Sequence, residues 1–541
     1  MLVRLVRGLL KAIKSQSTQP GRKRPEDGLF PNGLDISERE VVTGQLKLSA
    51  SLETNLKNIK EATGDSVDLG IRRFRVGGSQ VKGAIVYLDG MVDSRAIEQL
   101  IEDLTIELFK TRIDLADSLA VYEAAKETFV PQKSVEEVSD FAGLWDKVSM
   151  GGTGALFDGT NKALVIETRG WKTRSVEEPA AETTLRGERE GFIESLRVNT
   201  SLLRRRIRTP HLQIKSVFVG SLTKTEVAYA YIKGLASDDL VREVHDRLEK
   251  IDIDGVLESG YLEEYIEDTS FTLFPLMERT ERPDRVAASL LEGKLAVFTE
   301  GTPFVLVLPT QLSTLLQAPD DYYERLPIGS FIRVVRFIAF TMSIILPGFY
   351  VAVVNFHQEL LPTVLLMRIA ASREGVPFPA VVEVLIMEFL FEVLREAGVR
   401  LPRAIGPAVS IVGALILGDA AIRAGLVSPA VVITVALTAI ASFSAPVFSL
   451  AIAARLLRFI FIVLGGAFGL FGIQFGLLIM LTHLSALRSF GRPYLAPFAP
   501  LIARDLKDTL ARVWWWRMTT RPKLDAFREP KRQGEGHEPR V

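Results

Sequence analysis

The chain has 541 residues, which allows for roughly three or four domains. Its 65 Lys and Arg residues are balanced by 65 Asp and Glu residues, so the overall charge does not indicate a nucleic-acid-binding protein. Cysteine is absent, which excludes disulfides, thiol catalysis and cysteine-ligated metals. The five histidines lie far apart without metal-ligand spacing, so we expect neither a metal site nor a cofactor.

Charged and apolar residues divide the chain into two parts. Most of the charge precedes Leu326, whereas the long apolar runs lie between Phe331 and Leu487. This division predicts a soluble part followed by a membrane part. Basic residues flank the start of the first apolar run, and no secretory signal is recognised before it, so we expect the soluble part to be cytosolic.

Residues 1–45 predict a basic amphipathic tail and a linker. Between Met1 and Gln16, basic residues recur on one helical face and leucines lie largely on another. This pattern fits a short helix on an anionic membrane surface, and it fits a frayed basic tail equally well. Ser17 to Asn32 is rich in proline, glycine and charge, which is typical of a linker.

Residues 46–322 predict two cytosolic α/β subdomains. The first, 46–140, is expected to hold a helix at Glu53–Glu61, a strand at Ala84–Leu88 and a helix from Ser94. The second, 141–322, is expected to hold two hairpins, two strands and an acid-capped amphipathic helix. In chain order, these elements lie at Ala155–Thr168, Ile214–Val219, Val227–Ile232, Asp238–Lys250 and Lys294–Leu308.

Residues 323–500 predict an all-helical transmembrane domain of four to five spans. Four segments approach the ~20 residues that a bilayer core requires. They are Phe331–Val354, Ala404–Ile422, Val427–Ala453 and Phe459–His483. Leu360–Ala371 is too short to cross, and Ala380–Ala397 is long enough but charged. Four crossings would place the basic, aromatic tail, 501–541, on the cytosolic side, whereas a fifth would place that tail outside.

Carboxylates share one face of the charged segment. Glu388, Glu392 and Glu396 lie on one helical stripe together with Arg395, opposite an apolar face. Charges at membrane depth are costly and usually face protein or water. One interpretation is therefore a vestibule that attracts cations. The alternative is an interfacial amphipathic helix that Arg395 partly neutralises.

A second stripe lies on the span Ala404–Ile422. Val409, Val412, Ile416 and Asp419 follow helical spacing on one face. In a symmetric oligomer this stripe would stack apolar rings above a ring of carboxylates, an arrangement that can gate by dewetting and select cations. The alternative is that the valines face lipid and Asp419 lies among the headgroups.

The last apolar run contains four glycines at packing intervals. Gly465, Gly469, Gly472 and Gly476 give two Gly-x-x-x-Gly pairs. Glycines at this spacing allow helices to approach closely. The pattern predicts helix packing and carries no information on a substrate.

No enzyme motif is found. Gly151 to Gly154 lacks the downstream residues of a phosphate-binding loop and the spacing of a dinucleotide fingerprint. Neither a Gly-x-Ser-x-Gly nor a His-Glu-x-x-His motif is present. We therefore do not expect an enzyme.

Several long blocks of the chain, between about Leu46 and Pro500, are distinctive. The first are Leu88–Asp93 (LDGMVD) and, within Leu156–Leu212, the run GTNKALVIETRGWKTRSVEEPAAETTLRGEREGFIESLRVNTSLLRRRIRTPHL. The others are Pro402–Gly418 (PRAIGPAVSIVGALILG), Ala424–Pro429 (AGLVSP) and Leu456–Phe459 (LLRF). Together these blocks resemble the A subunit of the GerA-type spore germinant receptors.

The resemblance implies an integral protein of the spore inner membrane. It also implies two partners, a B subunit of the amino-acid-transporter type, which usually binds the germinant, and a lipoprotein C subunit. The A subunit is thought to form a homo-oligomeric ring that conducts monovalent cations and triggers germination. Carried onto this chain, the Pro402–Gly418 match places Val409, Val412 and Ile416 in the proposed pore helix. Asp419 stands where a neutral polar residue is expected in many relatives.

Three other interpretations stay open. A paralogous stage V sporulation channel subunit would share the fold, although the Ala181–Arg208 block looks more like the receptor type. A secondary transporter would move a solute by alternating access. A scaffold would only hold the B and C subunits within the membrane lipid.

Overall fold

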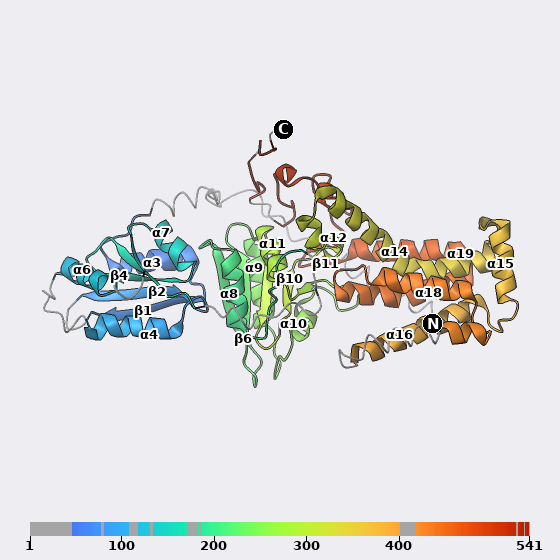
Figure 1. Cartoon of the computed structure of the whole chain (residues 1–541), viewed down its shortest axis with the longest axis horizontal. Coiled ribbons are helices and arrows are strands. Elements are labelled where there is room, and N and C mark those ends of the chain that lie inside the picture. The colour runs from blue at the N-terminus through green and yellow to red at the C-terminus, as the bar shows by residue number, and fades with distance from the viewer. Residues whose placement is uncertain are drawn as a thin grey trace, which may run out of the picture.

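The computed structural model describes residues 46–76, 81–107, 117–129, 134–170, 182, 186–400, 418–525, 529–534 and 536–539. This part of the chain forms three bodies in a row, two α/β domains followed by a helical domain (Figure 1). The amphipathic tail expected at Met1–Gln16 lies outside the described residues.

The first α/β domain is a five-stranded antiparallel sheet with helices on both faces. The strand order is β1-β2-β4-β5-β3. Its elements are α3 (Leu52–Thr63), β1 (Leu69–Arg75), β2 (Lys82–Leu88), α4 (Ser94–Glu102) with the π-helix η1 (Asp103–Glu107), α6 (Ser118–Phe129), β3 (Val135–Val138), α7 (Phe141–Val148), β4 (Gly152–Phe157) and β5 (Ala163–Glu167).

Alternation along β2 decides which helices cover each face. Ala84 and Val86 pack against α3 and α7, whereas Ile85 packs on the side of α4 and α6. Because strand side chains alternate between faces, one apolar run supplies two cores. Helix α3 begins after the N-cap Ser51, which accepts a backbone hydrogen bond, and ends at Gly64, whose φ of 65° is open to glycine.

The second α/β domain has the same layered architecture. Its strand order is β6-β7-β9-β10-β8, again antiparallel. Helices α8 and α11 cover one face, and α9 and α10 cover the other. The elements are α8 (Leu196–Arg206), β6 (Leu212–Val219), β7 (Thr225–Ile232), α9 (Asp238–Glu249), α10 (Ser259–Ile266), β8 (Glu278–Thr280), α11 (Pro283–Leu291), β9 (Leu295–Thr299) and β10 (Val305–Leu308).

The two sheets share one connectivity. In each sheet, the strands lie in the order first, second, fourth, fifth and third along the chain. Helices also precede the first strand, follow the second and precede the fourth in both domains. The soluble part is therefore an internal structural repeat, which no sequence pattern had indicated.

The division predicted at residue 140 is wrong. The hairpin expected at Ala155–Thr168 is β4–β5, and it lies between β2 and β3 of the first sheet. The first domain therefore extends to about Glu167, and the second begins near α8. Sequence patterns report hairpins, but they do not report which strands a hairpin will join, because that pairing is made between distant segments. The strands and helices predicted in both subdomains are otherwise present.

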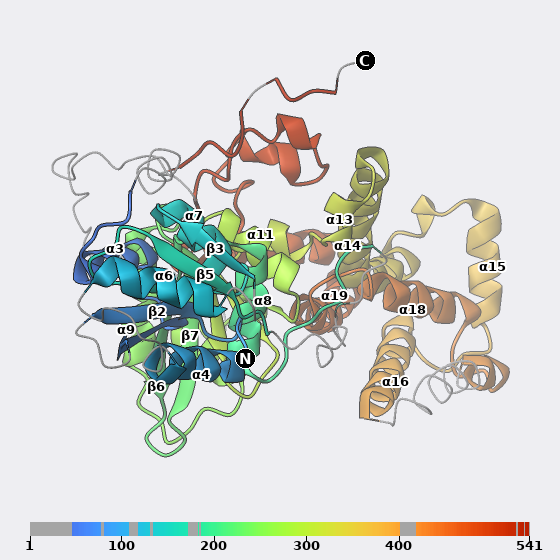
Figure 2. The same ribbon diagram turned by 60° about the vertical axis from the view of Figure 1, so that its left-hand side comes forward.

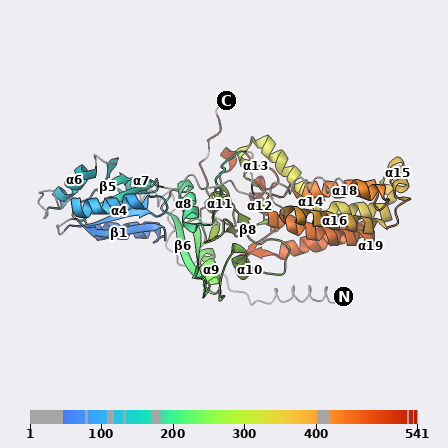
Figure 3. The same cartoon turned by 60° about the horizontal axis from the view of Figure 1, so that its bottom comes forward.

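The helical domain follows two short helices, α12 (Leu312–Leu315) and α13 (Asp320–Tyr323). Its elements are α14 (Leu326–Phe356), η2 (Gln358–Leu360), α15 (Thr363–Arg373), α16 (Ala380–Arg400), α18 (Pro429–Ser442) and α19 (Phe448–Ala486). Helices α14, α16, α18 and α19 lie side by side (Figure 3). Helix α15 lies at the end of this bundle far from the α/β domains (Figure 1).

Helix α19 reverses direction at Gly469, where φ is 60° and ψ is −144°. A side chain at Gly472 would meet the carbonyl oxygen of Leu464, and one at Gly476 would meet the ring of Phe461. In a straight helix, residues eight apart lie about 12 Å apart along the axis, so such contacts require the chain to run back on itself. α19 is therefore a helical hairpin with arms at 448–468 and 470–486.

Two of the predicted spans are wrong as single crossings. Val427–Ala453 is interrupted, because α18 ends at Ser442 and the next helix begins only at Phe448. Phe459–His483 contains the reversal at Gly469. A proline at 446 and a positive φ at a glycine break helices in ways that an apolar run does not reveal.

Among the residues that the structure describes, two helical segments are long and apolar enough to cross a membrane: Leu326–Phe356, and Phe448–Ala486 counted across its reversal at Gly469. The first segment contains the predicted span Phe331–Val354. The structure therefore confirms that this span is a helix long and apolar enough to cross a membrane. Most of the predicted span Ala404–Ile422 lies outside the described residues, which resume at 418. Four to five crossings therefore stay a prediction.

After α19 the chain returns to the second α/β domain through the short hairpin β11 (Arg488–Ser489) and β12 (Arg492–Pro493). Phe490 at its tip packs into the core under α9 and α10. The tail, with the 3-10 helices η3 (Asp505–Asp508) and η4 (Trp515–Arg517), then runs beside α11 and α13 (Figure 2). The start of α14 and the end of α19 thus both lie at the α/β end of the bundle.

Candidate functional site

The predicted pore stripe is described only at its end. Val409, Val412 and Ile416 lie outside the described residues. Asp419 lies in a helical segment described from residue 418 to 423, its side chain is 55% exposed, and its carboxylate lies 2.8 Å from the guanidinium of Arg423. The charge of Asp419 is therefore matched on its own helix. A ring of carboxylates at this position stays a prediction.

The helical domain contains a buried ion pair between Glu388 of α16 and Arg458 of α19. Arg458 Nη1 donates to Glu388 Oε2 over 2.6 Å, and both side chains are 1% exposed. Arg458 Nε also donates to the backbone oxygen of Ser343 in α14 over 2.8 Å. One arginine thus joins three helices inside the bundle.

A second cluster lies one turn further along α16. Glu392 accepts a hydrogen bond from Arg455 of α19, and its other oxygen is 3.9 Å from Arg395. Arg395 in turn donates to Ser442 of α18 over 3.2 Å and lies over the ring of Phe443. These contacts tie α16 to α18 and α19.

The remaining carboxylates of α16 differ in burial. Glu396 is exposed and pairs with Arg400 on its own helix at 2.6 Å. Glu383, near the start of α16, is fully buried. It accepts from Arg373 over 3.1 Å and from the backbone nitrogen of Ser428 over 2.9 Å. All four glutamates of α16 therefore pair with an arginine.

Sequence reasoning missed the arginines of α19 that accompany these carboxylates. Arg455 and Arg458 lie three residues apart in an apolar run, and Glu388 and Glu392 lie four apart in another. Both spacings place the two charges on one helical face. Two arginines three residues apart in one apolar segment and two glutamates four apart in another were thus a signal that these two helices face each other. The three glutamates of the predicted cation vestibule each have an arginine partner, and the vestibule stays a hypothesis.

The four predicted glycines lie at close helix contacts. A side chain at Gly465 would meet the backbone oxygen of Gly348 in α14. Gly469 forms the reversal, and Gly472 and Gly476 lie against the opposite arm of α19. Gly348 was not predicted, because its partner on α19 is more than a hundred residues away along the chain.

A second charged cluster joins the helical domain to the soluble part. Asp321 of α13 is 1% exposed and accepts from Arg333 over 3.1 Å and from Arg336 over 2.7 Å. Its backbone oxygen accepts from Arg512 of the tail over 2.8 Å. Asp508 of the tail pairs with Arg333 at 2.8 Å. We call these residues the junction cluster; Arg333 and Arg336 belong to the basic residues at the start of the first apolar run, which the sequence marked only as signs of orientation.

Burial changes the acidity of Asp508 in the junction cluster and of its neighbour Tyr322. It raises the pKa of the Asp508 carboxyl, and the neighbouring Arg333 charge opposes that rise. Burial also holds the pKa of the Tyr322 hydroxyl well above its usual range, and that hydroxyl donates to Asp508 over 2.8 Å. Tyr322 therefore stays a neutral donor at physiological pH.

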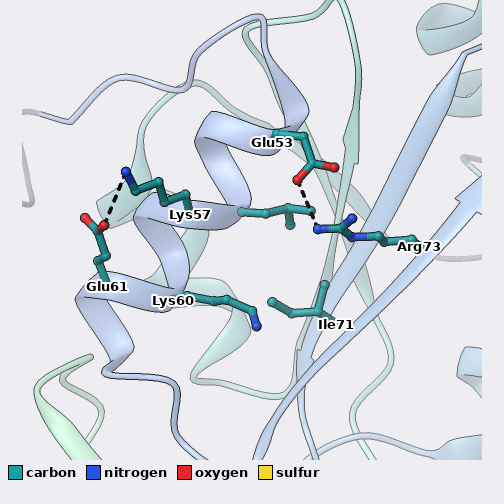
Figure 4. Close-up of a pocket in the computed structure, with 7 residues that line it drawn as sticks. Glu53, Lys57, Lys60, Glu61, Ile71 and Arg73 are labelled. Atoms are coloured by element: carbon teal, nitrogen blue, oxygen red, sulfur yellow. Dashed lines mark hydrogen bonds and ion pairs between the residues drawn. The ribbon is translucent and has the colours of Figure 1, made fainter.

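A shallow groove of about 620 Å³ lies beside α3 and β1 in the soluble part (Figure 4). Most of its charged residues pair with one another: Glu53 lies 3.0 Å from Arg73, and Lys57 lies 3.8 Å from Glu61. Within the described ranges, no group of three or more His, Asp or Glu side chains could hold a metal ion. The charged clusters of the helical domain and its junction are thus the candidate site.

These features define a class of protein. Two α/β domains of one topology are joined through buried charge to apolar helices suited to a membrane. The family model described as "Bacillus/Clostridium GerA spore germination protein" matches residues 57–524. The chain belongs to this family of spore germination proteins, as its sequence blocks predicted.

Several relatives resemble the chain over most of its length. Spore germination protein KA of Bacillus subtilis is 46% identical over 502 residues, which cover 91% of this chain and 90% of that protein. Spore germination protein GerLA of Bacillus cereus is 37% identical over 88% of this chain and 96% of that protein. A solved structure also matches: the crystal structure of the N-terminal domain of the A subunit of the Bacillus megaterium spore germinant receptor GerK3. Its sequence is 38% identical, the TM-score is 0.40, and the match covers 49% of this chain and 96% of that one.

Proposed function

We propose that this chain is the A subunit of a nutrient germinant receptor in the spore inner membrane. Family membership over residues 57–524 supports this role, as do relatives that are named spore germination proteins. The partners in this proposal are a transporter-like B subunit and a lipoprotein C subunit. The soluble part then faces the spore cytosol, and the subunit performs no enzymatic step.

In this proposal, copies of the chain assemble into a ring whose helices form a gated path for cations. The observation that carries it is the buried Glu388–Arg458 pair inside the apolar bundle. Charged groups are rare in membrane helices and mark ion paths or the supports of such paths. Glu388 Oε1 and Arg458 Nη2 have no hydrogen-bond partner among the described residues, so water would be stabilised beside them.

The path itself is proposed to run along Val409, Val412 and Ile416. Apolar side chains at a constriction exclude water until the ring widens, and conduction then follows wetting. The buried pairs of α16 and α19 would hold the neighbouring helices in place while the constriction changes.

The test replaces Val412 by alanine in spores that carry the whole receptor. A smaller side chain should weaken the dry constriction, so we expect Val412→Ala spores to release cations and lose dormancy without nutrient. Val463→Ala, at an exposed position of α19, is the matched control and should behave as the natural receptor does. Unchanged dormancy and cation release in the Val412→Ala spores would exclude Val412 from the gate.

A planar-bilayer recording separates the channel from a scaffold. The purified chain should carry cation current in an oligomeric state, and a scaffold would carry none. An alternating-access transporter is less well supported, because the break in α19 lies beside Phe356 and His357 at the far end of α14. A break at a bundle end is a hairpin turn, whereas transporters break their helices near the midplane.

A further inference from the structure

The tail after α19 exposes large apolar side chains. Leu501 is 71% exposed, and Leu510, Trp514 and Trp515 are each more than two-fifths exposed. Exposed apolar groups gathered in one segment usually mark a surface that something covers. The tail is held in place rather than loose, because Arg512 and Asp508 belong to the junction cluster.

The tail lies at the level where the apolar surface of α14 begins. Ser330 Oγ donates to the backbone oxygen of Arg512 over 3.3 Å. The next residue of α14, Phe331, is 69% exposed and starts an apolar face that continues with Ile332, Val335 and Ile338. The ring of Trp515 lies 5.7 Å from that of Tyr322, just before α14. The tail's tryptophans thus lie beside the first turns of the candidate span.

A second segment reaches the end of another membrane helix. Thr272 Oγ1 lies 3.0 Å from His483 Nε2, in the last turn of α19. Its neighbour Phe271 is 95% exposed. The returning arm of α19 exposes Leu478 and Leu481 just before that turn. Two segments far apart in the sequence therefore present aromatic side chains where the apolar surfaces of α14 and α19 end.

The tail also carries a local positive charge. From Arg512 to Lys523 it has four basic residues and no acidic residue. Arg517 and Lys523 are exposed. Tryptophan favours the boundary between hydrocarbon and water, and basic side chains favour anionic headgroups beside it. A bilayer surface satisfies both preferences at once.

We propose that Leu501, Trp514, Trp515 and Phe271 form an interfacial belt that enters the headgroup layer of an anionic bilayer. Arg517 and Lys523 contact the lipid phosphates. The occupant is lipid because both segments lie at the ends of candidate spans, which is the level that a membrane surface defines. This belt requires the helical domain to be in a membrane, as the proposed function does, but it does not require the chain to conduct ions.

The absence of cysteine allows single fluorescent labels to be attached to the full chain. Labels at Leu501→Cys, Trp515→Cys and Phe271→Cys are compared with one at Leu119→Cys, an exposed position of α6 in the domain farthest from the bundle (Figure 1). Each variant is reconstituted into vesicles of phosphatidylcholine and phosphatidylglycerol. An unchanged thermal unfolding midpoint shows that each labelled chain is folded.

Nitroxide-bearing lipids should quench the labels at 501, 515 and 271 several-fold more than the label at 119, and aqueous iodide should show the reverse order. Labels as accessible to iodide as that at 119 would overturn the belt. Labels protected from both quenchers would also overturn it, because a protein would then cover this surface.

The charge is tested in the Trp515→Cys background. Arg517→Gln with Lys523→Gln should reduce lipid quenching in vesicles that contain phosphatidylglycerol, and should have no effect in pure phosphatidylcholine. An equal result in both vesicles would overturn the role of anionic lipid. Neither measurement depends on ion current, so failure of the belt and failure of the channel are distinguishable.

Discussion

Asp68 of the first α/β domain and Arg204 of the second form a bidentate ion pair across the domain boundary. Arg204 Nε donates to Asp68 Oδ2 over 2.6 Å, and Arg204 Nη2 donates to Oδ1 over 2.9 Å. The two side chains are 2% and 1% exposed. Ser66 donates to the same carboxylate and to the backbone oxygen of Ile214 in β6. The repeated domains are thus fixed to each other by a buried polar contact.

Replacing Asp68 by asparagine should destabilise the soluble part by about 3 kcal/mol or more, because the buried Arg204 charge would lose its counter-ion. The measurement is the thermal unfolding midpoint of the full chain in detergent. Arg73→Gln breaks an exposed pair with Glu53 and should cost less than about 1 kcal/mol. Equal midpoints for the two variants would contradict a structural role for the buried pair.

The tail should dock less firmly as the pH rises. Burial raises the pKa of the Asp525 carboxyl from 3.8 to about 6, and the Lys294 charge opposes that rise. The protonated form therefore favours docking: its contribution is complete below pH 3.8 and is lost as the pH passes through about 6. A nitroxide at Lys523→Cys should become more mobile as the pH rises from 3.8 to about 6, the window between the two pKa values.

Asp525→Asn is the control for that measurement. An amide stays neutral throughout, so the spin label should keep one mobility across the same pH range. If the natural residue and asparagine gave the same pH profile, the titration of another group would be responsible.

The Glu388–Arg458 pair should hold the helical bundle together. Glu388→Gln leaves the Arg458 charge buried without its carboxylate, and we expect a loss of about 3 kcal/mol or more in stability. Removing both charges should cost less than removing one, which a double-mutant cycle in nanodiscs would measure. Glu396→Gln, in an exposed pair, is the control and should have little effect. A single-variant loss no larger than this control's would contradict the prediction.

Close approach of α14 and α19 requires glycine. A side chain at Gly348 would meet the backbone oxygen of Phe461, so Gly348→Ala should destabilise the bundle by about 1–3 kcal/mol. Gly375, between α15 and α16, has nothing within 4 Å of an added side chain, so Gly375→Ala should be neutral. The thermal unfolding midpoints of the two variants in nanodiscs test this prediction. A midpoint for Gly348→Ala as high as that of the natural chain would show that the helices are not in contact there.

Much of the secondary structure could be predicted from the sequence. The helix from Ser94, the strands near Ile214 and Val227 and the hairpin at Lys294–Leu308 are present in the structure. Alternation, helical periodicity and turn residues report these elements because they depend on neighbours in the chain. The reversal at Gly469 could not be predicted, because its surroundings are apolar on both sides.

The candidate site was predictable only in part. The stripe of carboxylates on α16 was visible as a helical pattern, and the burial of Glu388 is consistent with an inward face. Its partner Arg458 lies seventy residues later, on another helix. Which cation meets which carboxylate depends on the crossing of two helices, and no local pattern encodes that crossing.

The sequence by itself determined the division into a charged part and an apolar part, the family, and most helices and strands, because these depend on composition, motifs and short-range periodicity. Only the tertiary structure decided that β4 and β5 complete the first sheet, that the second domain repeats it, and that α19 folds back beside α14. Each of these outcomes is a contact between segments distant in the chain. Such contacts are selected by the burial of whole faces and the pairing of buried charges, which exist only once the chain has folded.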